Sequence, residues 1–183
     1  MDDIVKAAMA KWPNVPNCFG WLALDARGDW YLRDEPTQHA GPFPQVKGSR
    51  VVHDKLKAFI ERNYEADAQG RWYFQNGPQR VFVQLEATPW VWRVQWPAHG
   101  QGLAPAVTSH TGRAAQVRSS WLDDEGRLYL DTDLGPGLVH SQDMLDAAQA
   151  IEQGLWTPQP LAAADAPQRF GFVRAPVADP AAG

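Results

Sequence analysis

One eight-residue pattern occurs three times in this chain. The stretches are "DARGDWYL" (residues 25–32), "DAQGRWYF" (67–74) and "DDEGRLYL" (123–130). An aspartate with a glycine three residues later suits a tight turn, because the carboxylate accepts hydrogen bonds from turn amides and glycine adopts a positive φ without steric cost. The apolar residue and the tyrosine or aliphatic residues that follow begin a return strand. Each copy therefore predicts the tip of a β-hairpin.

The sequence around the first and third copies is repeated as well. A Trp-Leu pair precedes each copy, and a Val-His pair follows at His53 and His140, next to apolar residues at helical spacing. This order predicts that residues 19–62 and 119–154 are equivalent β-β-α units. The two histidines either approach each other about a pseudo-twofold axis, line a symmetric ligand pocket, or each satisfy a backbone group at the start of a helix.

The middle copy opens a segment of a different kind. Residues 64–96 combine an Asn-Gly turn with two β-forming stretches, "QRVFVQLE" and "WVWRVQW". We predict a central antiparallel meander here. Its last strand places three tryptophans on one face, Trp90, Trp92 and Trp96. Residues 97–115 are rich in glycine, proline and small residues, and we expect a long loop.

Together these features predict an α+β fold. We expect an antiparallel sheet of hairpins with helices on one face, and an internal duplication of a β-β-α unit around the central meander. The 183 residues suffice to bury a core, and 44% hydrophobic and 21% charged residues are typical of a globular protein. A single domain is expected over residues 1–156, followed by an extended, Pro/Ala-rich C-terminal tail over residues 157–183.

Composition limits the chemistry. The net charge is −4 and no basic block stands out, which argues against nucleic-acid binding. Cys18 is the only cysteine, and the five histidines lack metal-ligand spacing, so we expect no disulfide, no metal and no cofactor. No stretch approaches the roughly 20 apolar residues of a membrane helix, and the N-terminus lacks a signal-peptide pattern. We therefore expect a cytoplasmic protein that does not bind a membrane.

Two regions are candidates for ligand binding. The turn "QNGPQR" (residues 75–80) offers amides and an arginine that suit a carboxylate or phosphate, although the same residues are typical of an ordinary hairpin. The tryptophan face with Arg93 could stack a planar or sugar ligand, although such a stripe is more often core. The candidate ligand-binding residues are Gln75, Asn76, Gln79, Arg80, Trp90, Trp92, Arg93 and Trp96.

The first half of the chain also resembles a known family. The sequence from "DDIVKAAMAKWPNVPNCFGWLALDARGDWYLRD" through "FIERNY" to "GRWYFQNGPQRVFVQLEATPWVWR", residues 2–95, is similar to small uncharacterised proteobacterial proteins. The phrase "YFQNGPQRV" is the most specific part of this resemblance. More distantly, the layout is similar to another uncharacterised bacterial family with a repeated β-rich fold, for which architecture has suggested a role in signalling. Neither resemblance implies catalytic or binding residues.

We expect a non-enzymatic binding or regulatory module for a small anionic ligand or a protein partner, and we assign no catalytic residue. Two alternatives come from other classes. One is a small hydrolase or transferase that uses His99 or His110 of the long loop, and clustered histidines with a carboxylate in one cleft would favour it. The other is an assembly protein joined through the tryptophan face, which a buried face without a cleft would favour.

Overall fold

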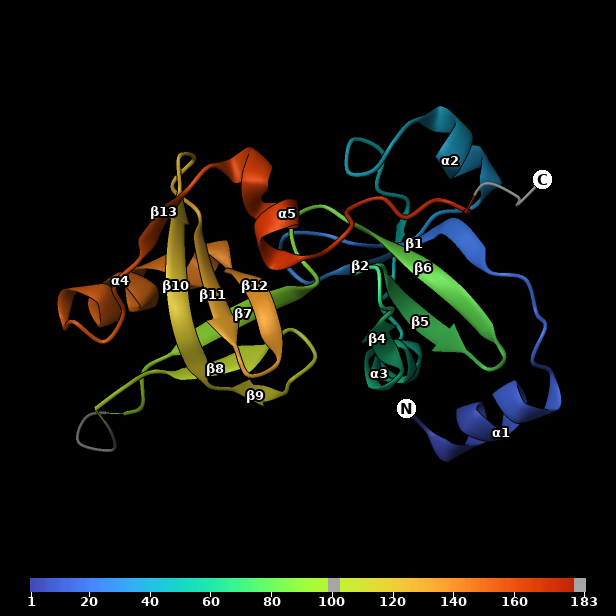
Figure 1. Ribbon diagram of the computed structural model, residues 1–183, viewed down its shortest axis with the longest axis horizontal. Helices are drawn as coiled ribbons and strands as arrows, with labels where there is room; N and C mark the ends of the chain where they lie inside the picture. Colours follow the sequence, from blue (N-terminus) through green and yellow to red (C-terminus); the bar gives the residue numbers. More distant parts are fainter. Residues whose placement is uncertain (99–102, 180–183) are drawn as a thin grey trace. The chain divides into compact units, whose positions relative to one another are not determined.

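The computed structural model describes residues 1–98 and 103–179 of the chain (Figure 1). Helices and strands are mixed along the chain, which confirms the predicted α+β class. Where the sequence predicted one domain, backbone contacts group the chain into two compact units, and each sheet lies in one of them. Unit 1 comprises Met1–Asp25, Asp29–Glu86 and the segment from Gly171, and unit 2 comprises Ala26–Gly28 and Ala87–Phe170.

Unit 1 is built on a six-stranded sheet with the order β3-β2-β1-β6-β5-β4. Strand β1 pairs antiparallel with β2 and parallel with β6, and β4, β5 and β6 form an antiparallel meander. The strands are β1 (Cys18–Leu24), β2 (Trp30–Leu32), β3 (Ser49–Arg50), β4 (Tyr64–Ala66), β5 (Trp72–Asn76) and β6 (Gln79–Leu85). The helices are α1 (Asp3–Lys11), α2 (Glu35–Ala40) and α3 (Asp54–Arg62).

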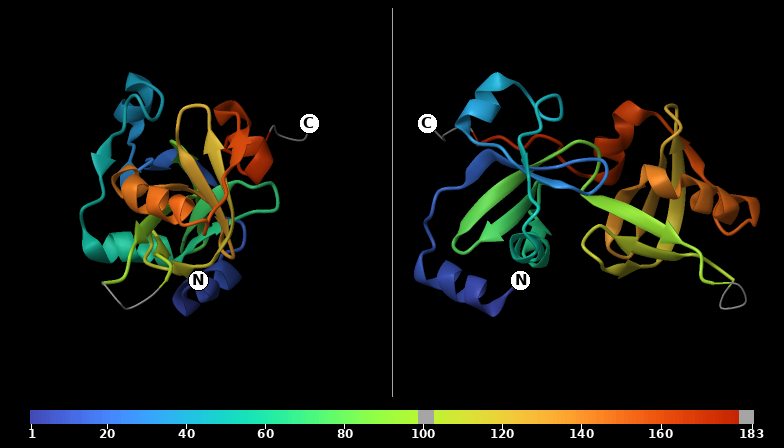
Figure 2. Two further views of the ribbon diagram at one scale, coloured as in Figure 1. Left: turned by 90° about the vertical axis from the view of Figure 1, so that its left-hand side faces the viewer. Right: turned by 180° about the vertical axis from the view of Figure 1, so that it is seen from behind.

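Unit 2 is built on a seven-stranded sheet with the order β13-β10-β11-β12-β7-β8-β9 (Figure 2). The strands are β7 (Trp90–Gln95), β8 (Ala106–Ser109), β9 (Ala114–Ala115), β10 (Val117–Asp123), β11 (Leu128–Thr132), β12 (Gly135–Val139) and β13 (Gln159–Leu161). The helices are α4 (Met144–Glu152) and α5 (Ala166–Phe170), with the 3-10 helices η1 (Ser141–Asp143) and η2 (Ala163–Asp165).

The two units share one order of elements. In unit 1, β1, β2 and β3 pair antiparallel in sequence, α3 follows, and β6 later pairs parallel with β1. In unit 2, β10, β11 and β12 pair in the same way, α4 follows, and β13 pairs parallel with β10. Each helix thus lies in the crossover that two parallel neighbours require. The hairpin, Val-His pair and helix predicted for each half are present in this order.

The turns formed by the repeated pattern have one geometry. The first residue donates its N–H to the carbonyl of the residue four positions later, and its side chain accepts that residue's N–H. For Asp123 these distances are 3.0 and 2.8 Å to Arg127. The glycines at 28, 70 and 126 have φ of 83°, 76° and 78°. A fourth turn uses Ser109 with Gly112, and serine in place of aspartate concealed it in the sequence.

Three segments differ from the sequence-based expectation. The predicted meander over residues 64–96 contains β4, β5 and β6, but β7 lies in the other sheet, parallel with β12. The buried hydroxyl of Thr88 donates to Trp90 O (2.6 Å) and accepts from Leu138 N (2.9 Å), which ties this connection to β12. The predicted loop over 97–115 contains β8 and β9, and the segment from 157 contains β13, η2 and α5.

Candidate functional site

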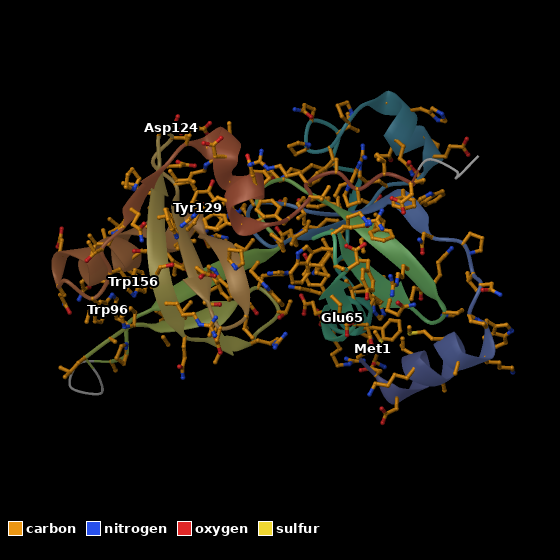
Figure 3. The ribbon with its side chains drawn as sticks, viewed as in Figure 1. Met1, Glu65, Trp96, Asp124, Tyr129 and Trp156 are labelled. Carbon is orange, nitrogen blue, oxygen red and sulfur yellow. The ribbon has the colours of Figure 1, made fainter. Side chains whose placement is uncertain are left out.

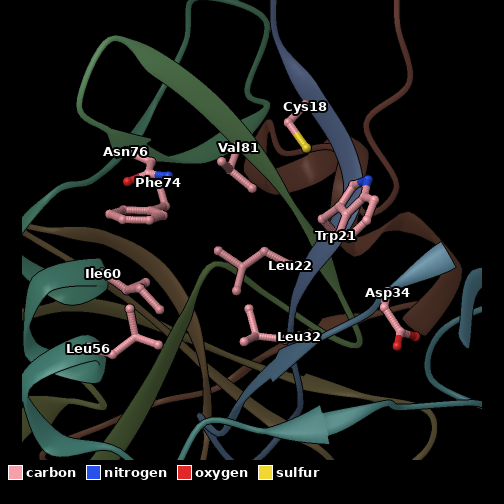
Figure 4. Close-up of a pocket in the computed structure, with 10 residues that line it drawn as sticks. All are labelled: Cys18, Trp21, Leu22, Leu32, Asp34, Leu56, Ile60, Phe74, Asn76 and Val81. Atoms are coloured by element: carbon pink, nitrogen blue, oxygen red, sulfur yellow. The ribbon is translucent and has the colours of Figure 1, made fainter.

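An apolar pocket lies between α3 and the strands of unit 1 (Figure 4). Its volume is about 450 Å³, within the range of small-molecule sites. All of its lining residues except Asp34 and Asn76 carry apolar side chains or a thiol. The lining consists of Cys18, Trp21, Leu22, Leu32, Asp34, Leu56, Ile60, Phe74, Asn76 and Val81.

An irregularity in β1 shapes this pocket. Cys18 pairs with Val81 and Leu22 pairs with Val83. Between these two pairs β1 advances by four residues, whereas β6 advances by two. Gly20 sits within this bulge with a φ of 82°, and a Cβ there would lie 2.5 Å from Gln38 Oε1. Bulges bend a strand and re-aim its side chains. This explains why the consecutive residues Trp21 and Leu22 both line the pocket, whereas neighbours on a regular strand point to opposite faces.

The pocket has a buried floor and an exposed rim. Leu22 and Ile60 are almost completely buried. In contrast, Trp21, Leu32 and Leu56 are 46%, 45% and 37% exposed. Figure 4 shows the two leucines of β1 and β2 converging with the two side chains of α3. Large apolar side chains that gather around a hollow mark a binding surface more strongly than scattered ones.

The polar groups of the pocket are few. Burial raises the pKa of the Cys18 thiol, so this side chain is neutral near pH 7. The Asp34 carboxylate accepts hydrogen bonds from the hydroxyl and the backbone N–H of Thr37, which lower its pKa and keep it charged. These bonds also cap the N-terminus of α2. The pocket can therefore hold an apolar group, and its one formal charge is negative.

The residues of the predicted turn "QNGPQR" divide among different surroundings. Asn76 lines the apolar pocket, whereas Gln75 and Arg80 line a second pocket of about 290 Å³ in unit 1. The Gln79 side chain donates to Pro16 O at 3.0 Å and fastens the segment after α1 to the hairpin. The Arg80 guanidinium lies 4.6 Å from the centre of the Tyr73 ring.

The predicted tryptophan face belongs to the core of unit 2. Trp90 and Trp92 are buried, and their rings stack with centroids 6.0 Å apart. Their indole N–H groups donate to Leu134 O (2.9 Å) and Leu130 O (3.0 Å). Trp96, which is labelled in Figure 3, is half-buried. Its indole N–H donates to Asp146 O at 2.9 Å. Val91 is buried as well, so both faces of β7 are covered at this point.

Arg93 is held by a carboxylate of unit 2. Its Nε and Nη2 donate to the two oxygens of Asp143 at 2.6 and 3.0 Å, and Val94 N donates to the same group at 3.0 Å. Burial alone would raise the pKa of Asp143, but these hydrogen bonds outweigh burial and lower it. Arg93 lines a polar pocket of about 420 Å³. Two of its guanidinium N–H groups already bind the Asp143 carboxylate, so they do not serve a ligand.

Three histidines have a structural contact in common. The Nδ1 atoms of His53, His140 and His110 accept backbone N–H groups at 3.4, 3.1 and 3.3 Å. For His53 and His140 the donor lies at the start of the following helix, which confirms the third of the predicted roles. His110 packs on the Trp90 ring. His39 is exposed on α2, and His99 lies outside the described residues.

Two further observations concern residues 1–98 and 103–179 alone. Among them no three histidine, cysteine, aspartate or glutamate side chains gather as a metal-binding group. In the same part of the chain, no helix combines the length and the apolar character that crossing a bilayer requires.

Comparison with known proteins places the chain in one family of unknown function. The model of the family DUF2944, described as "Protein of unknown function (DUF2946)", matches residues 1–177, so the resemblance seen over residues 2–95 extends into unit 2. A solved structure of a DUF1285 family protein from Silicibacter pomeroyi DSS-3 is similar, with a TM-score of 0.51 and 13% identity, over 81% of this chain and 84% of that chain. At this identity the likeness concerns the fold alone. No curated protein matches the chain.

Proposed function

Because the chain belongs to the family DUF2944, whose description states no function, we propose a function from its own residues. The protein is a non-enzymatic binding module, and the apolar pocket of unit 1 holds a small molecule with an apolar body. The observation that carries this proposal is the combination of a buried floor with an exposed rim of Trp21, Leu32 and Leu56. Each 100 Å² of apolar surface that a ligand removes from water contributes about 2.5 kcal/mol.

The lining also limits the class of ligand. A cavity of about 450 Å³ accepts a small molecule or one bulky group of a larger one. Asp34 makes an anion unfavourable, so the small anionic ligand expected from the sequence does not suit this pocket. The Asn76 amide offers one hydrogen-bonding group at the edge. A neutral, mainly apolar molecule with one polar group is the best match.

The alternatives receive less support. Trp90 and Trp92 are buried within unit 2, so assembly through the tryptophan face would need other residues. An enzyme that uses His110 would have to act through Nε2, because Nδ1 accepts from Val91 N, and Nε2 is buried. A regulatory role would follow if ligand binding alters a partner's affinity, and the same pocket would then be the sensor.

Titration with N-phenyl-1-naphthylamine, a neutral dye that fluoresces in apolar surroundings, tests the proposal. We expect saturable binding of one dye per chain. Leu32→Glu places a charge at the rim and should weaken binding by about tenfold or more, because a charge loses hydration when the dye covers it.

The matched control is Val52→Glu, since Val52 belongs to unit 1, is 78% exposed and does not line the pocket. This variant should bind the dye like the parent. Circular dichroism verifies that both variants are folded. Equal affinities for Leu32→Glu, Val52→Glu and the parent would refute the proposed site.

A further inference from the structure

We propose that unit 1 carries a second binding site, for a small carboxylate that also has an apolar group and a hydrogen-bond donor. The site is the pocket of about 290 Å³ formed by the segment after α1 and the β5–β6 hairpin. Trp12, Val15 and Asn17 line it from the segment, and Gln75, Pro78 and Arg80 line it from the hairpin. This inference does not depend on the apolar pocket beside α3.

Arg80 supplies the positive charge. Other arginines of unit 1 hold carboxylates, as Arg50 holds Asp29 (2.7 Å) and Arg71 holds Asp67 (2.7 Å). For Arg80, no carboxylate of the described residues lies within salt-bridge distance, and its planar group rests on the Tyr73 ring instead. Contact with an aromatic face orients the guanidinium and leaves its N–H edge for an anion.

Gln75 supplies an acceptor that lacks a donor. The residue is 1% exposed, and its Nε2 donates to Gly77 O at 3.0 Å. Its Oε1 is buried, and no donor among the described residues reaches it. Buried carbonyl oxygens are nearly always hydrogen-bonded, so this atom calls for a hydroxyl or amino group from outside the chain. Within the described residues, Arg80 therefore has no carboxylate partner and Gln75 Oε1 has no hydrogen-bond donor. Both residues line the same pocket.

The lining selects among anions. Arg80 is the one charged residue in it, which matches a single negative charge, and a planar carboxylate fits the guanidinium fork with two parallel hydrogen bonds. A phosphate monoester carries between about 1.5 and 2 negative charges near pH 7 and would require a second cation. Trp12 and Pro78 give the pocket apolar walls. The ligand is therefore a 2-hydroxy carboxylate with a compact apolar group.

Calorimetric titration with mandelate tests the charge. We expect one site per chain, and Arg80→Met should weaken binding by about tenfold or more, as loss of a charge-assisted pair does. Arg80→Lys keeps the charge but lacks the guanidinium fork. Its affinity for mandelate should lie between those of Arg80→Met and the parent. The matched control is Arg118→Met, because Arg118 is an exposed arginine of β10 in unit 2 and the change in net charge is the same. Its affinity should equal that of the parent.

A second titration tests the donor. Mandelate should bind more tightly than phenylacetate, which lacks the hydroxyl, and Gln75→Leu should remove this preference while phenylacetate still binds. The neutral mandelamide should bind weakly. The proposal is overturned if mandelate does not bind, if folded Arg80→Met binds it like the parent, if Gln75→Leu keeps the preference, or if phenyl phosphate binds as tightly. Leu32→Glu should leave mandelate binding unchanged, which separates this outcome from that of the apolar pocket.

Discussion

The helices α3 and α4 occupy the same place in their units, yet they pack differently. Each has nine residues and follows a histidine whose Nδ1 accepts a backbone N–H. The seventh residue is Ile60 in α3 and Ala150 in α4, and both are buried. Helix α4 buries Ala147 as well, whereas α3 holds Leu56 at the rim of a pocket. Since the side chains at the contact set packing distances, one topology can produce either a closed core or a ligand pocket.

The first and third turns, those of Asp25 and Asp123, show a related difference. In unit 2, the Asp123 carboxylate accepts from Arg127 Nε (2.8 Å) and from the Tyr129 hydroxyl (2.9 Å). In unit 1, Asp29 stands where Arg127 would be, and Asp25 instead accepts from Lys47 Nζ at 2.8 Å. Lys47 belongs to the long connection between β2 and β3. The equivalent connection in unit 2, between β11 and β12, has only two residues. The β2–β3 connection therefore supplies the cation that the first turn lacks.

The largest expected effect tests whether the core of unit 2 and the rim of the unit 1 pocket differ as described. Trp92→Ala should lower the free energy of unfolding by about 3–5 kcal/mol, because Trp92 is buried and the change leaves a cavity. Trp21→Ala should cost about half as much or less, because 46% of this residue is already exposed. Urea denaturation of both variants measures this. A Trp92→Ala protein as stable as its parent would contradict the assignment of this face to the core.

The next effect concerns the third turn. Burial would raise the pKa of Asp123, but hydrogen bonds from Arg127 and Tyr129 lower it below the usual value. Asp123→Asn should cost about 1.5–3 kcal/mol at pH 7, the range for hydrogen bonds to charged groups.

Its pH dependence follows from the lowered pKa. The stabilisation is complete above the unfolded-state pKa, near 3.9, and is lost as the pH falls through the lower, folded-state pKa. The difference in the free energy of unfolding between the parent and Asp123→Asn should therefore become smaller in acid. Urea denaturation at pH 7 and below pH 4 measures it. A difference that stays constant across this range would show that the charge of Asp123 does not contribute to stability.

A comparable or smaller effect sharpens the contrast between the helices. Ala150→Ile inserts bulk where α4 is fully buried and should cost about 1–3 kcal/mol through overpacking. Leu56→Phe adds bulk at the pocket rim and should change the free energy of unfolding by no more than about 0.5 kcal/mol, while it weakens binding of the neutral dye. Thermal unfolding and dye titration of the two variants provide the test. Equal destabilisation by both would mean that α3 packs as closely as α4.

The smallest effect leaves stability unchanged and reports on the pocket through Cys18. Because burial raises the pKa of this thiol, its reaction with a disulfide reagent should accelerate at a higher pH than that of a free cysteine. The neutral dye should slow the reaction, whereas mandelate should not. Absorbance of the released thiolate follows the rate, and the fully unfolded protein in urea is the reference. An ordinary pH profile without protection would place Cys18 outside the ligand pocket.

The features that the sequence predicted best are those set by interactions between residues close together in the chain. The turns at Asp25, Asp67 and Asp123 and the histidine caps depend on atoms within four residues, so one sequence suffices to find them. The α+β class and the burial of Trp92 follow from periodicity and residue type. Sequence also singled out Gln75 and Arg80, since amides and an arginine cluster at that turn.

Contacts distant in the sequence account for what was missed. The apolar pocket depends on a bulge in β1 and on helix residues some forty positions later, and neither leaves a local pattern. The walls of the second pocket at Trp12 and Asn17 lie still farther in the sequence from Gln75. Strands β8 and β9 consist of small residues without apolar alternation, so the sequence there is typical of a loop.

The segment from Gly171 has a consequence for the order in which the chain can fold during synthesis. Val173 N donates to Gly70 O at 2.9 Å, and Leu85 N donates to Arg174 O at 2.8 Å. Nearly all of unit 2 lies between these partners in the sequence. Strands β4 to β6 therefore leave the ribosome well before the residues that complete their hydrogen bonds, whereas unit 2 has all of its residues at Phe170. Because domains generally fold as units while the chain emerges, unit 1 starts first and finishes last.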